Sequence, residues 1–126
     1  MEKKPVGTIG WMDLTVPDAD MIRDFYGSVT GWKSQSFNMG EYSDYVMIPP
    51  DSEDGITGIC HAKGTNASLP PQWLIYIFVE NLDSSMSECV RLGGAIIAGP
   101  KSIEGQGKYC VIKDPAGAHC ALFEQF

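Results

Sequence analysis

The sequence predicts an α+β fold: two βαβββ modules whose curved, mixed sheets surround one cleft. The first observation is the length of 126 residues, which suits a single domain with one ordinary core. The second is that a strand, a helix and three further strands follow one another twice along the chain. The third is the interval between equivalent residues. Val16 and Val79 stand 63 positions apart, half the chain length, and Gly31 and Gly94 repeat that interval. The chain is therefore interpreted as one domain, residues 1–126, with an internal duplication.

Module one is expected at about residues 6–63 and opens with a strand at residues 7–16. Alternation divides the side chains of this strand between two faces, Trp11, Asp13 and Thr15 against Met12, Leu14 and Val16. Asp18 is expected to cap a helix that Gly31 ends. The helix carries an apolar stripe that should pack on its own sheet, made of Met21, Ile22, Phe25, Tyr26 and Val29. Strands at residues 32–39, 42–48 and 55–63 complete the module.

Module two is expected at about residues 72–126, after a connector at residues 64–71 that is either a lid over the cleft or a plain linker. Its first strand lies at residues 73–79, and Asn81 begins the cap of the second helix. The stripe of this helix is predicted at Met86, Cys89, Val90 and Leu92. Strands follow at residues 95–98, 108–113 and 118–123, and residues 101–109 are interpreted as a flexible flap.

Charge and composition argue against several classes of binding partner. The 16 acidic and 9 basic residues give a net charge of −7, which repels phosphate backbones, so no nucleic-acid partner is expected. Apolar runs are too short to span a bilayer and no signal peptide follows the first lysines, so we expect no membrane partner and a cytoplasmic location. The four cysteines lack paired spacing and are interpreted as reduced and buried, with a disulfide or a zinc site as the alternative.

Two runs carry a family resemblance. The first is DLTVPDADMIRDFYGSVTGW, and the second is WLIYIFVENLDSSMSECVRLGG, followed by the ending GKYCVIKDPAGAHCALFEQF. In order and register these resemble the glyoxalase/bleomycin resistance protein/extradiol dioxygenase superfamily, also called vicinal oxygen chelate (VOC) proteins. The resemblance covers about residues 7–123 and implies the two-module fold. It also implies a homodimer, because two-module members often pair.

The resemblance also implies where metal ligands would stand, because enzymes of this superfamily hold a divalent metal with His and Glu from four strands. Three of the positions carry Trp11, Leu74 and Ala121. The fourth lies in the strand at residues 55–63, where Cys60 matches best and Gly58 or His61 stay open. Tryptophan, leucine and alanine side chains do not bind such ions. We therefore expect no metal and no other cofactor.

The predicted site lies in the cleft. Its ligand-binding residues are expected to be Trp11, Asp13, Cys60, Leu74, Tyr76, Phe78, His119 and Ala121. The leading hypothesis is a protein that binds a small planar or apolar molecule without the usual metal. The alternative is a VOC-type lyase, isomerase or dioxygenase. It would use Asp13 and His119 as acid and base, or a relocated metal on those residues and His61. A third hypothesis is a structural or regulatory dimer with a vestigial cleft.

Overall fold

The computed structural model of the protein describes residues 3–126. Contacts divide the chain into two compact units. The N-terminal unit is Met12–Trp73. The C-terminal unit consists of Leu74–Phe126 and the residues up to Trp11. The start of the first strand therefore belongs to the C-terminal unit, where Gly7 and Thr8 exchange backbone hydrogen bonds with Phe78.

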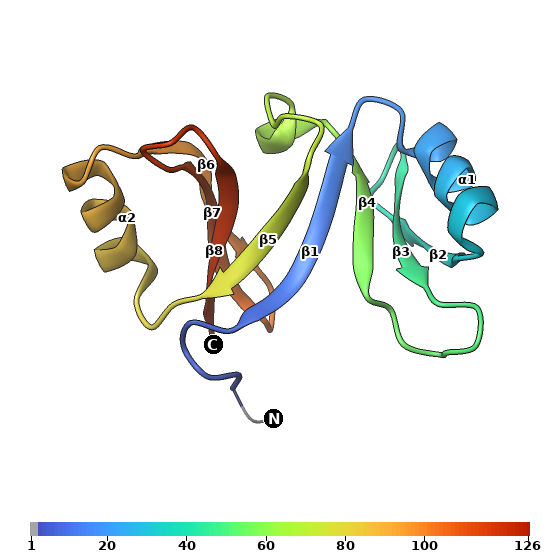
Figure 1. Cartoon of the computed structure of the whole chain (residues 1–126), viewed down its shortest axis with the longest axis horizontal. Coiled ribbons are helices and arrows are strands. Elements are labelled where there is room, and N and C mark those ends of the chain that lie inside the picture. Colours follow the sequence, from blue (N-terminus) through green and yellow to red (C-terminus); the bar gives the residue numbers. More distant parts are fainter. Residues whose placement is uncertain (1–2) are drawn as a thin grey trace. The chain divides into compact units, whose positions relative to one another are not determined.

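The N-terminal unit contains one four-stranded arrangement with a helix against it (Figure 1). Its elements are β1 (Ile9–Val16), α1 (Ala19–Thr30), β2 (Lys33–Asn38), β3 (Ser43–Ile48) and β4 (Thr57–His61). The strand order is β2-β3-β4-β1, with β1 parallel to β4 and the other neighbours antiparallel. A short 3-10 helix at Gly64–Asn66 occupies part of the predicted connector.

Helix α1 begins and ends where the sequence predicts. The Asp18 carboxylate accepts a hydrogen bond from the backbone N–H of Met21, and Gly31 takes a φ of +81° at the C-cap. A side chain at that φ is strained, so glycine is the favoured residue. The helix packs on a core formed by Leu14, Val16, Ala19, Tyr45, Met47 and Ile59.

The predicted apolar stripe of α1 is only partly buried. Ile22 and Tyr26 pack on the core, but Met21, Phe25 and Val29 are each more than half exposed. The prediction that the whole stripe packs on the sheet is wrong for these three residues. The reason is geometric: they form a line at intervals of four residues, and a helix lying on a sheet buries mainly the line that faces it.

The C-terminal unit repeats the pattern around α2 (Leu82–Arg91) (Figure 1). Its strands are β5 (Trp73–Phe78), β6 (Ala95–Ile103), β7 (Gly107–Lys113) and β8 (His119–Gln125). They follow the order β5-β8-β7-β6, with β5 parallel to β8. Asn81 caps α2 as predicted, by accepting from the backbone N–H of Ser84. The core under α2 contains Leu82, Cys110, Ile112 and Leu122. Of the predicted stripe, Val90 and Leu92 are exposed instead of buried.

The predicted flap at residues 101–109 is a regular hairpin. Lys101 pairs with Tyr109 and Ile103 with Gly107 across a turn, so β6 extends to Ile103 instead of ending at Ala98. The sequence was misinterpreted there because an exposed strand needs backbone pairing, not apolar side chains. The four cysteines are free thiols, but the prediction that all are buried is wrong, because only Cys110 is buried and Cys60, Cys89 and Cys120 are partly exposed. Neither of the two α-helices that the structure describes is long and apolar enough to cross a membrane.

Candidate functional site

The side of the N-terminal sheet opposite α1 carries two carboxylates. Leu14, Tyr45 and Ile59 pack toward α1, so alternation turns their strand neighbours to the other side. We call that side the acidic face. Its residues are Asp13 and Thr15 on β1, Asp44 and Val46 on β3, and Gly58 and Cys60 on β4. Asp13 stands directly beside Gly58, and Thr15 beside Cys60.

Gly58 leaves the space that the Asp13 carboxylate occupies. A β-carbon added at position 58 would lie 2.3 Å from Asp13 Oδ1 and 3.6 Å from Cys60 Sγ. Protein atoms do not approach that closely, so any larger residue at position 58 would displace the carboxylate. Asp13 is partly exposed. The acidic face therefore presents a partly solvent-accessible carboxylate that the neighbouring strand is shaped to accommodate.

Asp44 lies on the other side of Cys60. Its Oδ1 accepts a hydrogen bond of 2.8 Å from the backbone N–H of His61, and its carboxylate accepts from the Cys60 thiol. Burial raises the pKa of the Cys60 thiol far above its ordinary value, and the negative charges of Asp13 and Asp44 raise it further. The raised pKa keeps the thiol protonated at neutral pH and makes it a poor nucleophile there.

Asp44 is a site residue that the sequence analysis missed. The signal was available, because Tyr45 and Met47 alternate as apolar residues along β3 and are buried toward α1. Alternation from those two residues places Asp44 on the opposite side of the strand.

The side of the C-terminal sheet opposite α2 carries a cluster of aromatic rings, which we call the aromatic face. Strand alternation assigns it, because Ile77 and Leu122 pack into the core under α2. Its four rings belong to Tyr76, Phe78, Tyr109 and Phe123. Ring centroids lie 5.8 Å apart for Tyr76 and Tyr109, 6.5 Å for Tyr76 and Phe123, and 5.8 Å for Phe78 and Phe123. These spacings are typical of favourable aromatic pairs.

Five of the predicted site residues share the aromatic face. Tyr76 stands beside Ala121 in the parallel register of β5 and β8, and Leu74 and His119 precede them by two residues on the same side. Phe78 completes the set. Leu74 is 1% exposed and Ala121 is 0% exposed, whereas Tyr76 and His119 are partly exposed. Tyr109 was not predicted, although it aligns with Phe123 in the antiparallel pair of β7 and β8.

The remaining predicted residues are placed as follows. Asp13 and Cys60 lie on the acidic face of the N-terminal unit. Trp11 belongs to the C-terminal unit, and alternation puts its side chain on the same side of β1 as Asp13. His61 does not share the face of Asp13. Its register partner is Val16, and its ring lies by Ser43 and Asp20 on the α1 side of the sheet. The relocated metal site that combines Asp13 with His61 is therefore wrong, because the two residues point to opposite sides.

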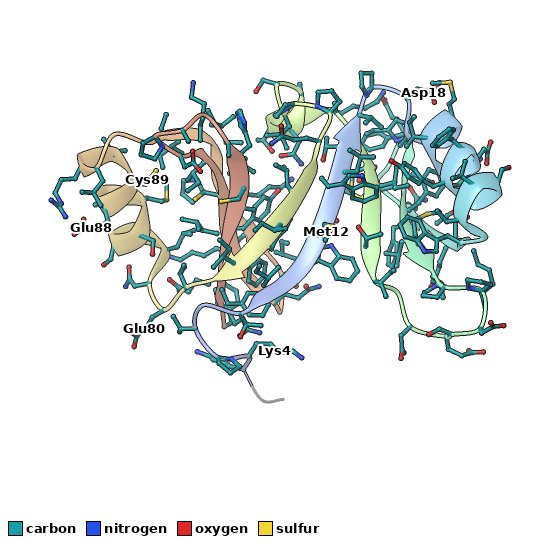
Figure 2. The ribbon with its side chains drawn as sticks, in the orientation of Figure 1. Lys4, Met12, Asp18, Glu80, Glu88 and Cys89 are labelled. Carbon is teal, nitrogen blue, oxygen red and sulfur yellow. The ribbon has the colours of Figure 1, made fainter. Side chains whose placement is uncertain are left out.

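Each unit also has an apolar groove on its helix side. One, of about 500 Å³, lies between α2 and its strands and is lined by Cys89 on the helix (labelled in Figure 2), by Leu92 at its C-cap, and by Ile112 and Leu122 on the sheet. The other, of about 270 Å³, is lined by Met12, Trp32, Ile56, Thr57 and Trp73. Neither includes a predicted ligand-binding residue. Trp73 packs edge-on against Tyr26 and Trp32.

Known proteins resemble this chain along most of its length. A Mycobacterium tuberculosis protein named "Putative glyoxylase CFP32" is 28% identical over 112 residues, which cover 89% of this chain and 42% of that protein. The anthracycline biosynthesis protein DnrV of Streptomyces peucetius is 25% identical and is matched over 94% of this chain and 47% of its own length. The chain thus spans about half the length of these relatives.

Solved structures agree on the fold. Methylmalonyl-CoA epimerase from Mycobacterium tuberculosis aligns with a TM-score of 0.58 at 15% identity, over 100% of this chain and 93% of the epimerase. At that identity the likeness concerns the fold alone. Residues 8–122 match the sequence profile of one superfamily. The chain belongs to the Glyoxalase/Bleomycin resistance protein/Dioxygenase superfamily.

Proposed function

We propose that the protein binds a small, planar, largely apolar molecule on its aromatic face, without the divalent metal that enzymes of the superfamily use. The observation that carries the proposal is the grouping of the rings of Tyr76, Phe78, Tyr109 and Phe123 on one side of the C-terminal sheet. Three of these rings are partly exposed, and aromatic rings stack readily on planar ligands.

The positions that the superfamily resemblance assigns to metal ligands do not fit a metal. Leu74 and Ala121 have no donor atom in their side chains and are almost completely buried. Trp11 offers only an indole N–H, which donates and does not coordinate. Cys60 is the one donor in the set, and its thiol stays protonated between two carboxylates. Divalent ions need imidazole, carboxylate or thiolate ligands, so this set of side chains gives no support to metal chemistry at the inherited position.

The name of one relative supports a choice of ligand class for the first test. This relative is named for anthracycline biosynthesis, and anthracyclines contain a flat system of fused rings. A flat fused-ring molecule offers the shape that four clustered side-chain rings accept by stacking. We therefore choose a planar fused-ring quinone, dihydroxyanthraquinone, as the first probe.

The test is a titration of the full chain with this probe. Binding is monitored by the fluorescence of the protein's three tryptophans and by NMR. We expect saturable binding that a chelator leaves unchanged. Tyr76→Ala should weaken the binding by about tenfold, because a lost aromatic contact costs about 1.4 kcal/mol. The matched control is Phe25→Ala, which removes an exposed ring on α1 and should leave the affinity unchanged. Equal affinities of the two variants, or binding that requires added metal, would contradict the proposal.

A second candidate function rests on the acidic face. There Gly58 makes room for the Asp13 carboxylate, and this arrangement favours an acid–base enzyme of the lyase, isomerase or dioxygenase class. His119, on β8 of the C-terminal unit, stays a candidate for the second proton-transfer group. Asp13→Asn keeps the size of the side chain and removes its basicity. If turnover of a dicarbonyl or catechol substrate is measurable, this variant should lose most of it, and unchanged turnover would exclude Asp13 as the base.

Homodimer formation, a cytoplasmic location and the absence of nucleic-acid and membrane partners stay predictions. Light scattering of the purified chain tests the first of them. A mass of twice 13.7 kDa is expected for the homodimer.

A further inference from the structure

We propose that His61, Asp18 and Asp20 form a binding site for a divalent transition-metal ion such as Zn²⁺, on the α1 side of the N-terminal unit. The three side chains each offer one ligand atom, and these atoms all lie within 4.8 Å of one another. The site differs from the set that the superfamily resemblance assigns to metal ligands, because it includes none of Trp11, Cys60, Leu74 and Ala121 and shares with that set only His61, an open alternative at the fourth position.

The topology brings the three residues together. His61 is the last residue of β4 and pairs with Val16, the last residue of the parallel strand β1. The chain leaves β1 at that point and enters α1, where Asp18 is the N-cap (Figure 2) and Asp20 lies in the first turn, so both come close to His61.

The His61 ring is oriented with Nε2 toward the Asp20 carboxylate. Its side chain is 10% exposed, and its Nδ1 lies 2.9 Å from the carbonyl oxygen of Ser43. A carbonyl oxygen only accepts, so Nδ1 carries a proton, which leaves Nε2 as the ring nitrogen that could bind an ion. Metal-binding histidines commonly donate their second ring N–H to a backbone carbonyl in this way.

Nε2 of His61 faces the Asp20 carboxylate. Oδ1 of Asp20 lies 3.8 Å from Nε2, beyond hydrogen-bond distance, and Oδ1 of Asp44 lies 3.5 Å from Nδ1 of the same ring. Within residues 3–126 no hydrogen bond to Nε2 is present. A cation bound between Nε2 and the Asp20 carboxylate would be attracted by both.

The two carboxylates are held in place by other groups. Asp18 Oδ1 accepts from the backbone N–H of Met21 at 3.1 Å, and Asp20 Oδ1 accepts from the Tyr45 hydroxyl. Each carboxylate keeps a second oxygen. One imidazole and two carboxylates are ligands that Zn²⁺ and similar ions accept, and both carboxylates are exposed enough to give the ion a path from solvent.

The neighbouring cation does not fill the site. The Arg23 guanidinium lies 4.5 Å from the centre of the Tyr45 ring and pairs with Asp24 at 2.9 Å. Its charge is therefore directed to a carboxylate outside the cluster. Asp24 thus supplies a matched control, because it is an exposed carboxylate on the same helix that does not belong to the site.

The test uses the full chain and Zn²⁺ alone, and follows the imidazole nitrogens by NMR. The chain contains two histidines, so His119 serves as an internal control in every spectrum. We expect Zn²⁺ to shift the Nε2 resonance of His61 and to leave His119 unchanged. A spectrum in which His61 is an imidazolium that Zn²⁺ does not perturb would overturn the proposal, because an ion pair with Asp20 would then satisfy the ring. A shift confined to His119 would overturn it too.

Calorimetry with matched variants assigns the ligands. Asp18→Asn keeps the helix cap, since asparagine caps as well as aspartate, and His61→Gln keeps a polar side chain of similar length. Each should weaken Zn²⁺ binding by at least about tenfold, whereas Asp24→Asn should not change it. Tight binding that survives both Asp18→Asn and His61→Gln would place the ion elsewhere and overturn the proposal. Neither variant touches the aromatic face, so this result is independent of the proposed function.

Discussion

Replacing Gly58 by alanine tests the geometry of the acidic face directly. The new β-carbon would lie 2.3 Å from Asp13 Oδ1, so the carboxylate must move by roughly 1 Å to reach a normal contact. Forcing an extra methyl group into a packed site lowers the free energy of unfolding by about 1–3 kcal/mol. Alanine also reduces the entropy of the unfolded chain, which offsets up to about 1 kcal/mol of this loss. We expect Gly58→Ala to lower the free energy of unfolding by about 1–2 kcal/mol in urea denaturation.

A double-mutant cycle identifies the cause. With Asp13→Ala in the background, the contact is gone, and Gly58→Ala should cost little or become stabilising, which gives a coupling energy of about 1 kcal/mol or more. The matched control is Gly27→Ala in α1, where the nearest atom is the Trp32 carbonyl oxygen at 3.4 Å and helix propensity should stabilise the protein by about 0.5–1 kcal/mol. Additive effects of Gly58→Ala and Asp13→Ala, within about 0.5 kcal/mol, would refute the placement of this carboxylate.

Three further substitutions have expected outcomes in the same assay. Gly31→Ala places a side chain at a φ of +81° and should cost about 1 kcal/mol; an unchanged midpoint would refute this cap. Thr57→Val removes the buried hydrogen bond of 2.6 Å to the Met12 carbonyl and should cost about 1–2 kcal/mol, and no loss would show that the bond contributes nothing. Burial raises the pKa of Cys110 from 9.0 to about 11. The unfolded thiol therefore ionises first, and this residue's share of the stability, about 2–3 kcal/mol, should be lost as the pH rises from 9 to 11. In Cys110→Ala that part of the pH dependence should disappear, and an identical slope in both proteins would contradict it.

Local interactions let the sequence by itself determine much of this protein. The order of strands and helices and both N-caps follow from residues that act on their immediate neighbours, such as Asp18 on the N–H of Met21. Alternation along β1 likewise separates Asp13 from Leu14, because successive side chains of a strand point to opposite sides. The same local motifs carry the superfamily resemblance, which the match over residues 8–122 confirms.

Features that depend on a partner strand were decided only by the tertiary structure. The register of β4 against β1 sets His61 on the helix side and Cys60 on the acidic face, and a register is a relation between strands that the spacing in one strand does not contain. The β6–β7 pairing lengthens β6 through backbone hydrogen bonds. The pattern of side chains along the sequence does not predict such bonds.

The exposure of Met21, Phe25 and Val29 along α1 also depends on contacts between elements. Met21 and Ile22 are both apolar and adjacent in sequence, and only the angle at which the helix meets its sheet buries one and exposes the other. Local sequence thus determined which elements form, whereas the contacts between elements decided which side chains face the candidate sites.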